Sequence, residues 1–256
     1  MTEKKILVNN LSINYKVFGG DKGKPILILH GWGSRSEKWH GVAELLEKEG
    51  IMVLVPDLPG FGESDEPKTA WNIDNYVEFV KDFSESFSEL KKGFYLLGHS
   101  FGGAIASKFA IRYNQKVDKL FLVSASCIRE KTFFKKVLYF FAKLIGIFSF
   151  LPYYQYLRKV FYKFIYKKSD YSYVSGVMKE TYLRGISEDL SQKLFFVKVP
   201  TVIIWGDKDD LTPVTQAKII NKKIENSKLI IIEGADHNLG KKDQPEVLTK
   251  KILENI

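Results

Sequence analysis

Short apolar runs alternate with longer segments of helical periodicity along most of this chain. Most of the runs are continuously apolar, as expected of strands buried on both faces of a parallel sheet. The runs fall at residues 6–8, 13–17, 25–29, 52–55, 94–97, 120–124, 201–205 and 229–232. The helical segments are residues 36–48, 74–90, 102–113, 214–224 and 245–254. The alternation predicts an α/β fold, with an open, mostly parallel sheet and helices on both faces.

The first two runs differ from the others. Residues 12–17 alternate between polar and apolar side chains, which is typical of a strand with one solvated face. We therefore predict an antiparallel edge pair at the start of the chain, joined by a turn at Asn9 and Asn10.

Residues 129–196 interrupt the alternation of predicted strands and helices. They contain several helical periodicities and no convincing strand, which predicts a core of residues 1–128 and 197–256 and an inserted helical segment of residues 129–196. Residues 129–168 hold ten lysines and arginines against one acidic residue, and 14 of the 36 aromatic residues. The net charge of +9 lies entirely there, because basic and acidic residues balance in the rest of the chain.

Length and composition indicate one soluble domain, since 45% of the 256 residues are hydrophobic and 27% are charged. The N-terminal residues include no apolar stretch of the signal-peptide type, and the single cysteine, Cys127, excludes an intrachain disulfide. Both observations favour a cytoplasmic protein. No group of residues has the spacing of metal ligands and no dinucleotide fingerprint is present, so neither a metal nor a cofactor is expected.

The segment Gly98-His99-Ser100-Phe101-Gly102 stands between a predicted strand and a predicted helix. A strand that turns sharply into a helix can expose one serine hydroxyl at the apex, beside backbone N–H groups. So tight a turn leaves no room for side chains two residues before and two residues after the serine, where Gly98 and Gly102 stand. The context predicts that Ser100 is a nucleophile; an ordinary glycine-rich turn is the alternative.

Three other predicted strands end in residues suited to catalysis. These ends are His30-Gly31-Trp32-Gly33, the acidic segment 206–213 and Glu233-Gly234-Ala235-Asp236-His237. Catalytic groups on an open parallel sheet gather at such carboxyl ends. A serine, an acid and a histidine in that chain order are typical of a serine hydrolase on this topology.

Four histidines are candidates for the base that takes the serine proton. His237 is predicted because it stands at a strand end, after the serine and the acid. His40 falls on a helix, and His99 lies inside the elbow and is expected to point away from Ser100. His30 is expected to hold its loop by hydrogen bonding.

The sequence resembles the α/β-hydrolase superfamily over essentially its whole length, and within it the serine esterases and lipases that carry a helical cap. The resemblance rests on residues 30–33 (HGWG), 57–64 (DLPGFGES), 98–103 (GHSFGG), 206–213 (GDKDDLTP) and 234–237 (GADH). It implies the α/β-hydrolase fold, with a mostly parallel eight-stranded sheet. The inserted segment 129–196 would then be a cap over the active site.

The resemblance also selects the acid. Asp209 stands three residues after Gly206 and four before a proline, as the family pattern requires. Asp207 and Asp210 would then belong to the turn and the helix start, and Asp236 would be structural.

Ser100, Asp209 and His237 would thus form a catalytic triad, and the backbone N–H groups of Trp32 and Phe101 would form the oxyanion hole. The side chains of Trp32 and Phe101 would wall the substrate pocket. Aromatic side chains of the cap would complete it, among them Phe140, Phe141 and Phe148.

These inferences predict a carboxylesterase or lipase-like enzyme that cleaves a hydrophobic carboxylic ester through an acyl-enzyme intermediate. One alternative is a hydrolase of C–C bonds in meta-cleavage products, a group that usually has tryptophan where this chain has Asn238. Another is a methyl ester esterase acting on an acyl carrier, which typically has tryptophan where this chain has His99. A ligand-binding receptor on the same fold is the alternative that is not an enzyme.

The basic, aromatic residues 129–168 have two interpretations, which predict different binding partners. One interpretation is a small aromatic core with solvated lysines. The other is an amphipathic lid that approaches an anionic membrane surface or an acidic acyl carrier. Residues 138–151 are apolar but short and interrupted by Lys143, so they are not expected to cross a membrane. Nucleic acid is not expected, because catalytic motifs accompany the basic residues.

Overall fold

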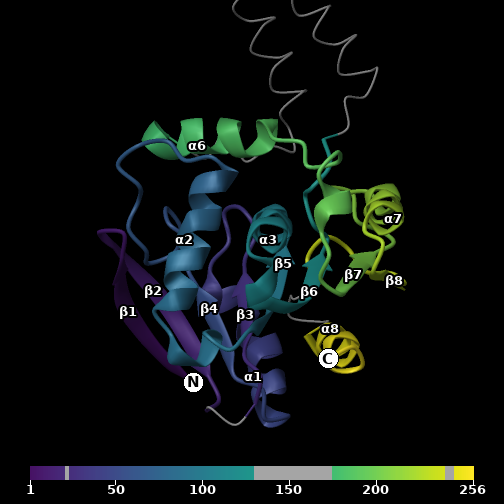
Figure 1. Ribbon diagram of the computed structural model, residues 1–256, viewed down its shortest axis with the longest axis horizontal. Helices are drawn as coiled ribbons and strands as arrows, with labels where there is room; N and C mark the ends of the chain where they lie inside the picture. The colour runs from purple at the N-terminus through teal and green to yellow at the C-terminus, as the bar shows by residue number, and fades with distance from the viewer. Residues whose placement is uncertain (21–22, 130–174, 240–244) are drawn as a thin grey trace, which may run out of the picture.

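The computed structural model describes the chain except for residues 21–22, 130–174 and 240–244. Eight strands form one sheet in the order β1-β2-β4-β3-β5-β6-β7-β8 (Figure 1). They are β1 (Thr2–Val8), β2 (Leu11–Phe18), β3 (Ile26–Leu29), β4 (Val53–Pro56), β5 (Phe94–His99), β6 (Val117–Val123), β7 (Thr201–Gly206) and β8 (Ser227–Ile232). Strands β3 to β8 are all parallel. Each predicted apolar run is a strand, and the predicted fold class is confirmed.

The first two strands form the predicted antiparallel hairpin. They pair along all of β1, from Thr2 opposite Val17 to Val8 opposite Leu11, and β2 also pairs antiparallel with β4. Asn9 and Asn10 have φ angles of 52° and 62°. Two successive positive φ angles are what a two-residue hairpin turn needs to match the twist of its strands, and asparagine tolerates them.

Helices cover both faces of the sheet. The α-helices are α1 (His40–Lys48), α2 (Ile73–Glu85), α3 (Phe101–Arg112), α6 (Gly176–Ser187), α7 (Val214–Lys223) and α8 (Pro245–Leu253). Short 3-10 turns are η1 (Ser36–Trp39), η2 (Ser88–Leu90), η3 (Asn114–Lys116) and η5 (Leu194–Phe196). Helices α1 and α8 pack on one face of the sheet, and α2, α3 and α7 pack on the other.

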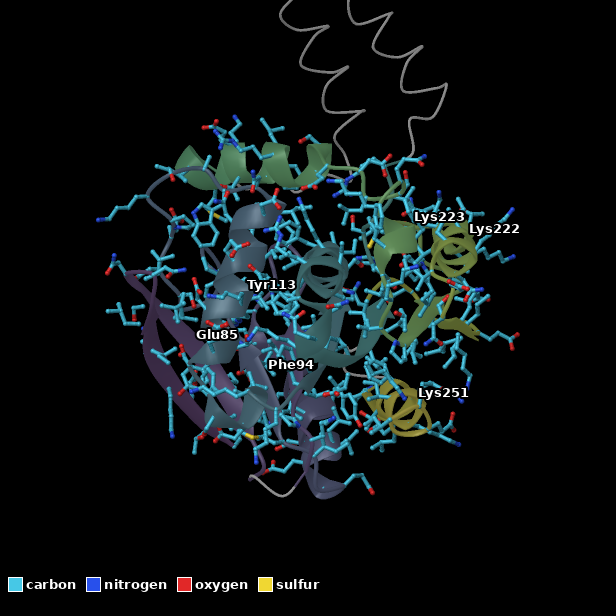
Figure 2. The ribbon with its side chains drawn as sticks, in the orientation of Figure 1. Glu85, Phe94, Tyr113, Lys222, Lys223 and Lys251 are labelled. Atoms are coloured by element: carbon cyan, nitrogen blue, oxygen red, sulfur yellow. The ribbon has the colours of Figure 1, made fainter. Side chains whose placement is uncertain are left out.

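The side chains of adjacent residues in a strand pack on opposite faces of the sheet, because successive side chains of a pleated strand alternate in direction. In β5, Leu96 packs on the face that α2 and α3 cover, whereas Leu97 packs on the face that α1 covers. Figure 2 shows Phe94 of the same strand in the interior, while the labelled lysines of α7 and α8 lie at the edge of the molecule. Burial on both faces explains why these runs lack polar alternation.

Two predicted helices are shorter than the sequence pattern indicated. The segment 36–48 divides into η1 and α1, and the segment 74–90 ends as an α-helix at Glu85. Phe87 has extended backbone angles, with φ −116° and ψ 123°, so residues Ser88–Leu90 form a separate turn. The apolar spacing continues through this break, which is why periodicity alone did not place it.

Helix α6 lies across the N-terminal ends of α2 and α3, at the carboxyl edge of the sheet (Figure 1). Gly60 adjoins the Met178 side chain of α6, and Gly185 faces the ring of Phe101. The backbone N–H of Trp71 donates to Thr181 Oγ1 at 3.0 Å. Of the predicted cap, the structure describes only residue 129 and residues 175–196, so the division into core and cap stays a prediction.

Candidate active site

Ser100 occupies the single position between the end of β5 and the start of α3. Its backbone angles, φ 51° and ψ −114°, lie in a region that L-amino acids avoid, so local strain is held here by the surrounding structure. The Ser100 N–H donates to the carbonyl of Val123 at 3.0 Å, and the Ser100 carbonyl accepts from the N–H of Ser126 at 2.9 Å. The end of β6 therefore anchors the turn that presents the serine.

The glycines of the elbow stand where a side chain would collide with backbone. A Cβ atom on Gly98 would come within 3.0 Å of the Gly102 carbonyl, and one on Gly102 within 3.0 Å of the Leu29 and His30 carbonyls. The predicted reason for these two glycines is confirmed. The collision with β3 adds a second cause, because the elbow packs directly on the loop that follows that strand.

Ser100, His237 and Asp209 form one hydrogen-bonded chain. The Nε2 atom of His237 lies 3.0 Å from Ser100 Oγ, and its Nδ1 atom lies 2.8 Å from Asp209 Oδ2. The three residues follow β5, β8 and β7, which lie close together because β5 to β8 are consecutive neighbours in the sheet. The sheet thus brings together the three side chains predicted to form the triad.

The carboxylate of Asp209 is fully buried and fully hydrogen-bonded. Oδ1 accepts the backbone N–H groups of Leu211 and Thr212 at 3.0 and 2.8 Å, and Oδ2 accepts the Thr212 hydroxyl at 2.7 Å as well as His237. Burial opposes ionisation of Asp209, but the hydrogen bonds from His237 and Thr212 outweigh it and hold the pKa of Asp209 below its usual value. The acid is therefore an anion that orients the histidine.

Thr212 is part of this site, although sequence reasoning assigned it no role. Its Oγ1 atom also lies 3.1 Å from His237 Nδ1 and 3.3 Å from the Ser124 carbonyl. Its place in the acidic segment that precedes α7 was the only available signal, and that signal does not reveal the direction of a side chain.

Asp207 and Asp236 make structural hydrogen bonds in the loops near the histidine. Asp207 Oδ1 accepts the N–H of Gly234 at 2.7 Å, and Asp236 Oδ1 accepts the N–H of Asn238 at 2.7 Å. Both contacts shape the loop after β8, and neither carboxylate is hydrogen-bonded to the ring of His237.

His30 holds the loop after β3, as predicted. Its Nδ1 atom lies 2.8 Å from the Gly31 carbonyl, and its Nε2 atom accepts the N–H of Leu58 at 2.9 Å. Nδ1 therefore carries the proton, because Nε2 acts as an acceptor. Burial lowers the pKa of His30, which keeps the ring neutral. His40 instead pairs with Glu44 on α1.

His99 does point away from Ser100, but it has a role that the sequence did not reveal. Its Nε2 atom lies 2.9 Å from the backbone carbonyl of His237, and the two rings are 5.0 Å apart. Burial, together with the adjacent His237, lowers the pKa of His99 to about 4. A neutral His99 with its proton on Nε2 therefore donates to the His237 carbonyl at neutral pH.

The loop after β3 runs directly beside the nucleophile. A Cβ atom on Gly31 would lie 3.2 Å from Ser100 Cβ, so the backbone that leads into Trp32 is close to the serine. Phe101 begins α3, and N–H groups in the first turn of a helix have no acceptor within the helix. The indole of Trp32 packs edge-on against the rings of Phe101 and Tyr182. Trp32 and Phe101 thus wall the space above Ser100.

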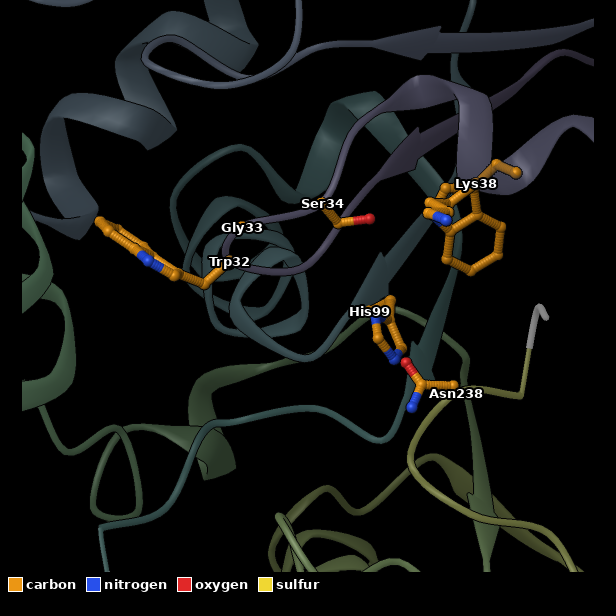
Figure 3. A pocket seen from close by; sticks show the side chains of 7 residues that line it. Trp32, Gly33, Ser34, Lys38, His99 and Asn238 are labelled. Atoms are coloured by element: carbon orange, nitrogen blue, oxygen red, sulfur yellow. The ribbon is translucent and has the colours of Figure 1, made fainter. Parts of the chain in front are cut away.

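Two cavities open at this point. A cavity of about 380 Å³ contains the serine and the histidine, and its described lining is Gly31, Trp32, Ser34, His99, Ser100, Phe101, Ser126, Arg129, Tyr182, Ile186, Leu211, Thr212, His237 and Asn238. A second cavity of about 280 Å³ shares Trp32, Ser34, His99 and Asn238 with it and extends to Lys38 and Trp39. Figure 3 shows Asn238 beside His99 in this second cavity, with Lys38 near its far end.

The predicted pocket aromatics Phe140, Phe141 and Phe148 lie outside the described residues. Within the described part of the chain, no three His, Cys, Asp or Glu side chains are grouped so as to hold a metal ion. No helix in that part is both long enough and apolar enough to cross a bilayer.

Known proteins resemble this chain in both sequence and structure. A family model described as the alpha/beta hydrolase fold matches residues 24–148. The AB hydrolase superfamily protein YisY of Bacillus subtilis is 29% identical over 244 residues, which cover 84% of this chain and 85% of that protein. A monoacylglycerol lipase of Homo sapiens is 25% identical over 280 residues, covering 94% of this chain and 77% of the lipase. An esterase from Exiguobacterium antarcticum has the same fold, with a TM-score of 0.75, 22% identity and coverage of 99% and 98%.

Proposed function

The chain belongs to the α/β-hydrolase superfamily, and we propose that it is a serine hydrolase that cleaves a hydrophobic carboxylic ester through an acyl-enzyme intermediate. The observation that carries the proposal is the hydrogen-bonded chain from Asp209 through His237 to Ser100. Similarity to a monoacylglycerol lipase supports ester cleavage among the reactions of the superfamily.

The geometry suits removal of the serine proton. His237 Nε2 is 3.0 Å from Ser100 Oγ, within the distance over which a base accepts a proton from a nucleophile. As the oxygen attacks the ester carbonyl, the proton passes to Nε2, and the buried anion of Asp209 stabilises the imidazolium. The same Nε2 then protonates the leaving alcohol, and water repeats the sequence to release the acid.

The negative oxygen of each tetrahedral intermediate needs fixed donors. We propose the backbone N–H groups of Trp32 and Phe101, which flank Ser100 in the larger cavity. Each donor of this kind contributes about 2.7–4 kcal/mol to stabilisation of the transition state.

The walls of the larger cavity support a substrate with an apolar part. Trp32, Phe101, Ile186 and Leu211 surround the serine, and Ile186 and Leu211 are 40% and 51% exposed. Apolar surface that remains accessible around a nucleophile gains free energy when a hydrocarbon chain covers it.

A direct test is covalent labelling by a fluorophosphonate together with hydrolysis of p-nitrophenyl esters from C2 to C16. We expect labelling and turnover in the native protein and the loss of both in Ser100→Ala. Ser86→Ala is the matched control, since that serine caps α2 on an exposed surface and should leave both readouts unchanged. An unlabelled native protein that still binds esters would contradict the proposal and favour a ligand-binding receptor.

We also propose that the basic residues 129–168 bring the enzyme to an anionic surface, which is a membrane or an acidic acyl carrier. Their charge supports this proposal, since ten basic residues stand against one acid. Anionic vesicles, or an acidic carrier protein, should then accelerate hydrolysis of long-chain esters at low salt. A short-chain optimum that neither addition changes would contradict it.

A further inference from the structure

The larger cavity contains one cationic side chain among its described lining residues, that of Arg129. It follows β6 in the chain and is only partly exposed. The partners of this side chain matter, because burial of a charge is unfavourable unless the charge has a partner.

Three hydrogen bonds hold the guanidinium in place. Nη1 donates to Ser126 Oγ at 2.6 Å, Nη2 to the Gly185 carbonyl at 3.1 Å and Nε to the Glu188 carbonyl at 3.2 Å. These acceptors are a hydroxyl and two backbone carbonyls, so they orient the guanidinium without neutralising it. A guanidinium has five N–H donors, and these contacts engage three of them.

The carboxylates of Glu188 and Asp189 lie near enough to stabilise the charge of Arg129, but their hydrogen bonds go to other groups. The Glu188 carboxylate pairs with Lys108 Nζ at 2.5 Å. The Asp189 carboxylate accepts the backbone N–H groups of Ser191 at 2.9 Å and of Arg129 at 3.4 Å. Among the described residues, no carboxylate is hydrogen-bonded to the guanidinium of Arg129, and two of its five N–H donors are left for a ligand in the cavity.

The guanidinium shares the larger cavity with Ser100 and is linked to its backbone through one residue. Ser126, which accepts from the guanidinium, donates its own N–H to the Ser100 carbonyl at 2.9 Å. An anionic group bound to Arg129 would thus lie only a few carbon atoms from an ester carbonyl placed over Ser100.

The two halves of an ester can be assigned to the two cavities. The leaving oxygen must be near His237 Nε2, from which it takes a proton. His237 lines the larger cavity, and Asn238, the next residue, lines both cavities, so the smaller cavity with Lys38 and Trp39 opens on the side of the base. The alcohol half is therefore expected on that side, and the acyl half extends toward Phe101 and Arg129.

We propose that the acyl half of the substrate carries a carboxylate that binds Arg129, so that the preferred substrates are monoesters of dicarboxylic acids with a short apolar spacer. This inference rests on the proposed ester hydrolysis and makes Arg129 a specificity-determining residue. The planar guanidinium fork matches a carboxylate, and the apolar walls of Phe101 and Ile186 suit the spacer.

The test compares monomethyl adipate with methyl hexanoate, which differ only by a carboxylate in place of a methyl group at the far end of the acyl chain. The native protein should hydrolyse the monoester with a kcat/KM about tenfold to a hundredfold higher, the range expected for a charge-assisted hydrogen bond. Arg129→Gln should remove this preference while it retains hydrolysis of methyl hexanoate. Arg129→Lys should retain part of it.

The matched control is Arg184→Gln on α6. The guanidinium of Arg184 is bonded to the Ala70 carbonyl and to Glu180, its side chain is 49% exposed, and it does not line either cavity. This variant should keep the preference of the native protein.

Equal kcat/KM for the two esters in the native protein would overturn the inference, as would equal losses for both in Arg129→Gln. A preference for acetylglycolate over ethyl acetate would overturn the assignment of the acyl half. Binding of monomethyl adipate to Ser100→Ala protein, measured by calorimetry, separates this inference from the proposed reaction. Binding about tenfold weaker in the double variant with Arg129→Gln supports the anion site even if no ester is hydrolysed.

Discussion

The Nε2 atom of His99 donates a hydrogen bond to the backbone carbonyl of His237 over 2.9 Å. The residue before the proposed nucleophile thus holds the loop that carries the proposed base. The contact links the elbow after β5 to the loop after β8, the two segments that carry Ser100 and His237.

We therefore expect His99→Ala to lower kcat by about tenfold to a hundredfold with little change in KM, since misplacement of a catalytic group by about 1 Å costs that much. His99→Gln, which keeps a donor, should recover part of the loss. The measurement is steady-state hydrolysis of p-nitrophenyl butyrate, with the melting temperature recorded in parallel. A fall in the melting temperature with unchanged kcat would contradict a positioning role.

Thr212 offers a second test of how the base is oriented. Thr212→Val removes the hydroxyl that Asp209 Oδ2 accepts at 2.7 Å but keeps the shape of the side chain. We expect kcat to fall about tenfold, because loss of one hydrogen bond to a charged group costs about 1.5–3 kcal/mol and His237 supplies part of the compensation. Thr212→Ser should restore activity; equal losses in both variants would show that packing of the methyl group matters instead.

Asp57 should make stability depend on pH. Its buried carboxylate accepts the backbone N–H groups of Ser36 at 2.6 Å and Glu63 at 3.0 Å. Burial opposes ionisation of Asp57, but these hydrogen bonds outweigh it and hold its pKa below the usual value. Because the pKa of Asp57 is lower in the folded protein than its unfolded value of about 3.9, its ionised carboxylate stabilises the fold at pH values above about 3.9. This stabilisation is lost as the pH falls through the pKa of Asp57 in the folded protein.

Asp57→Asn should accordingly lower the free energy of unfolding at pH 7 by about 1–3 kcal/mol and flatten its decline below about pH 4. Urea unfolding at several pH values measures both effects. Asp118→Asn is the control, because the side chain of Asp118 is 37% exposed in a surface ion pair with Lys24 and should change stability by less than about 1 kcal/mol. Parallel pH profiles for Asp57→Asn and the native protein would contradict the argument.

Gly102→Ala should disrupt the elbow. Its Cβ atom would collide with the carbonyls of Leu29 and His30, which are backbone and cannot move aside cheaply. We expect destabilisation of about 1–3 kcal/mol or more and loss of turnover. Gly20→Ala, whose Cβ atom would meet nothing within 4 Å, should leave both unchanged. The measurements are the melting temperature and the rate of ester hydrolysis of the two variants. Equal values for Gly102→Ala and Gly20→Ala would contradict the prediction.

Periodicity predicted the strands more accurately than the ends of the helices. Eight apolar runs became eight strands. The inner strands β3, β4 and β7 are buried at every residue, because helices cover both faces of the parallel sheet there. The segment 74–90 was predicted as one helix, yet it breaks after Glu85. At the break, the ring of Phe87 packs against Tyr15 on β2, a contact between residues that are far apart in the chain.

What the sequence determined by itself is the identity and order of the proposed catalytic side chains. The glycines around Ser100 follow from local sterics, and His237 follows from its place after a later strand. Resemblance to the α/β-hydrolase superfamily selected Asp209 among the acidic residues of segment 206–213. Only the tertiary structure revealed the contacts from which roles for Thr212, His99 and Arg129 are proposed. Each depends on contacts between strand ends that are far apart in the chain, and such contacts are set by sheet order and loop path. No local pattern of residues encodes them.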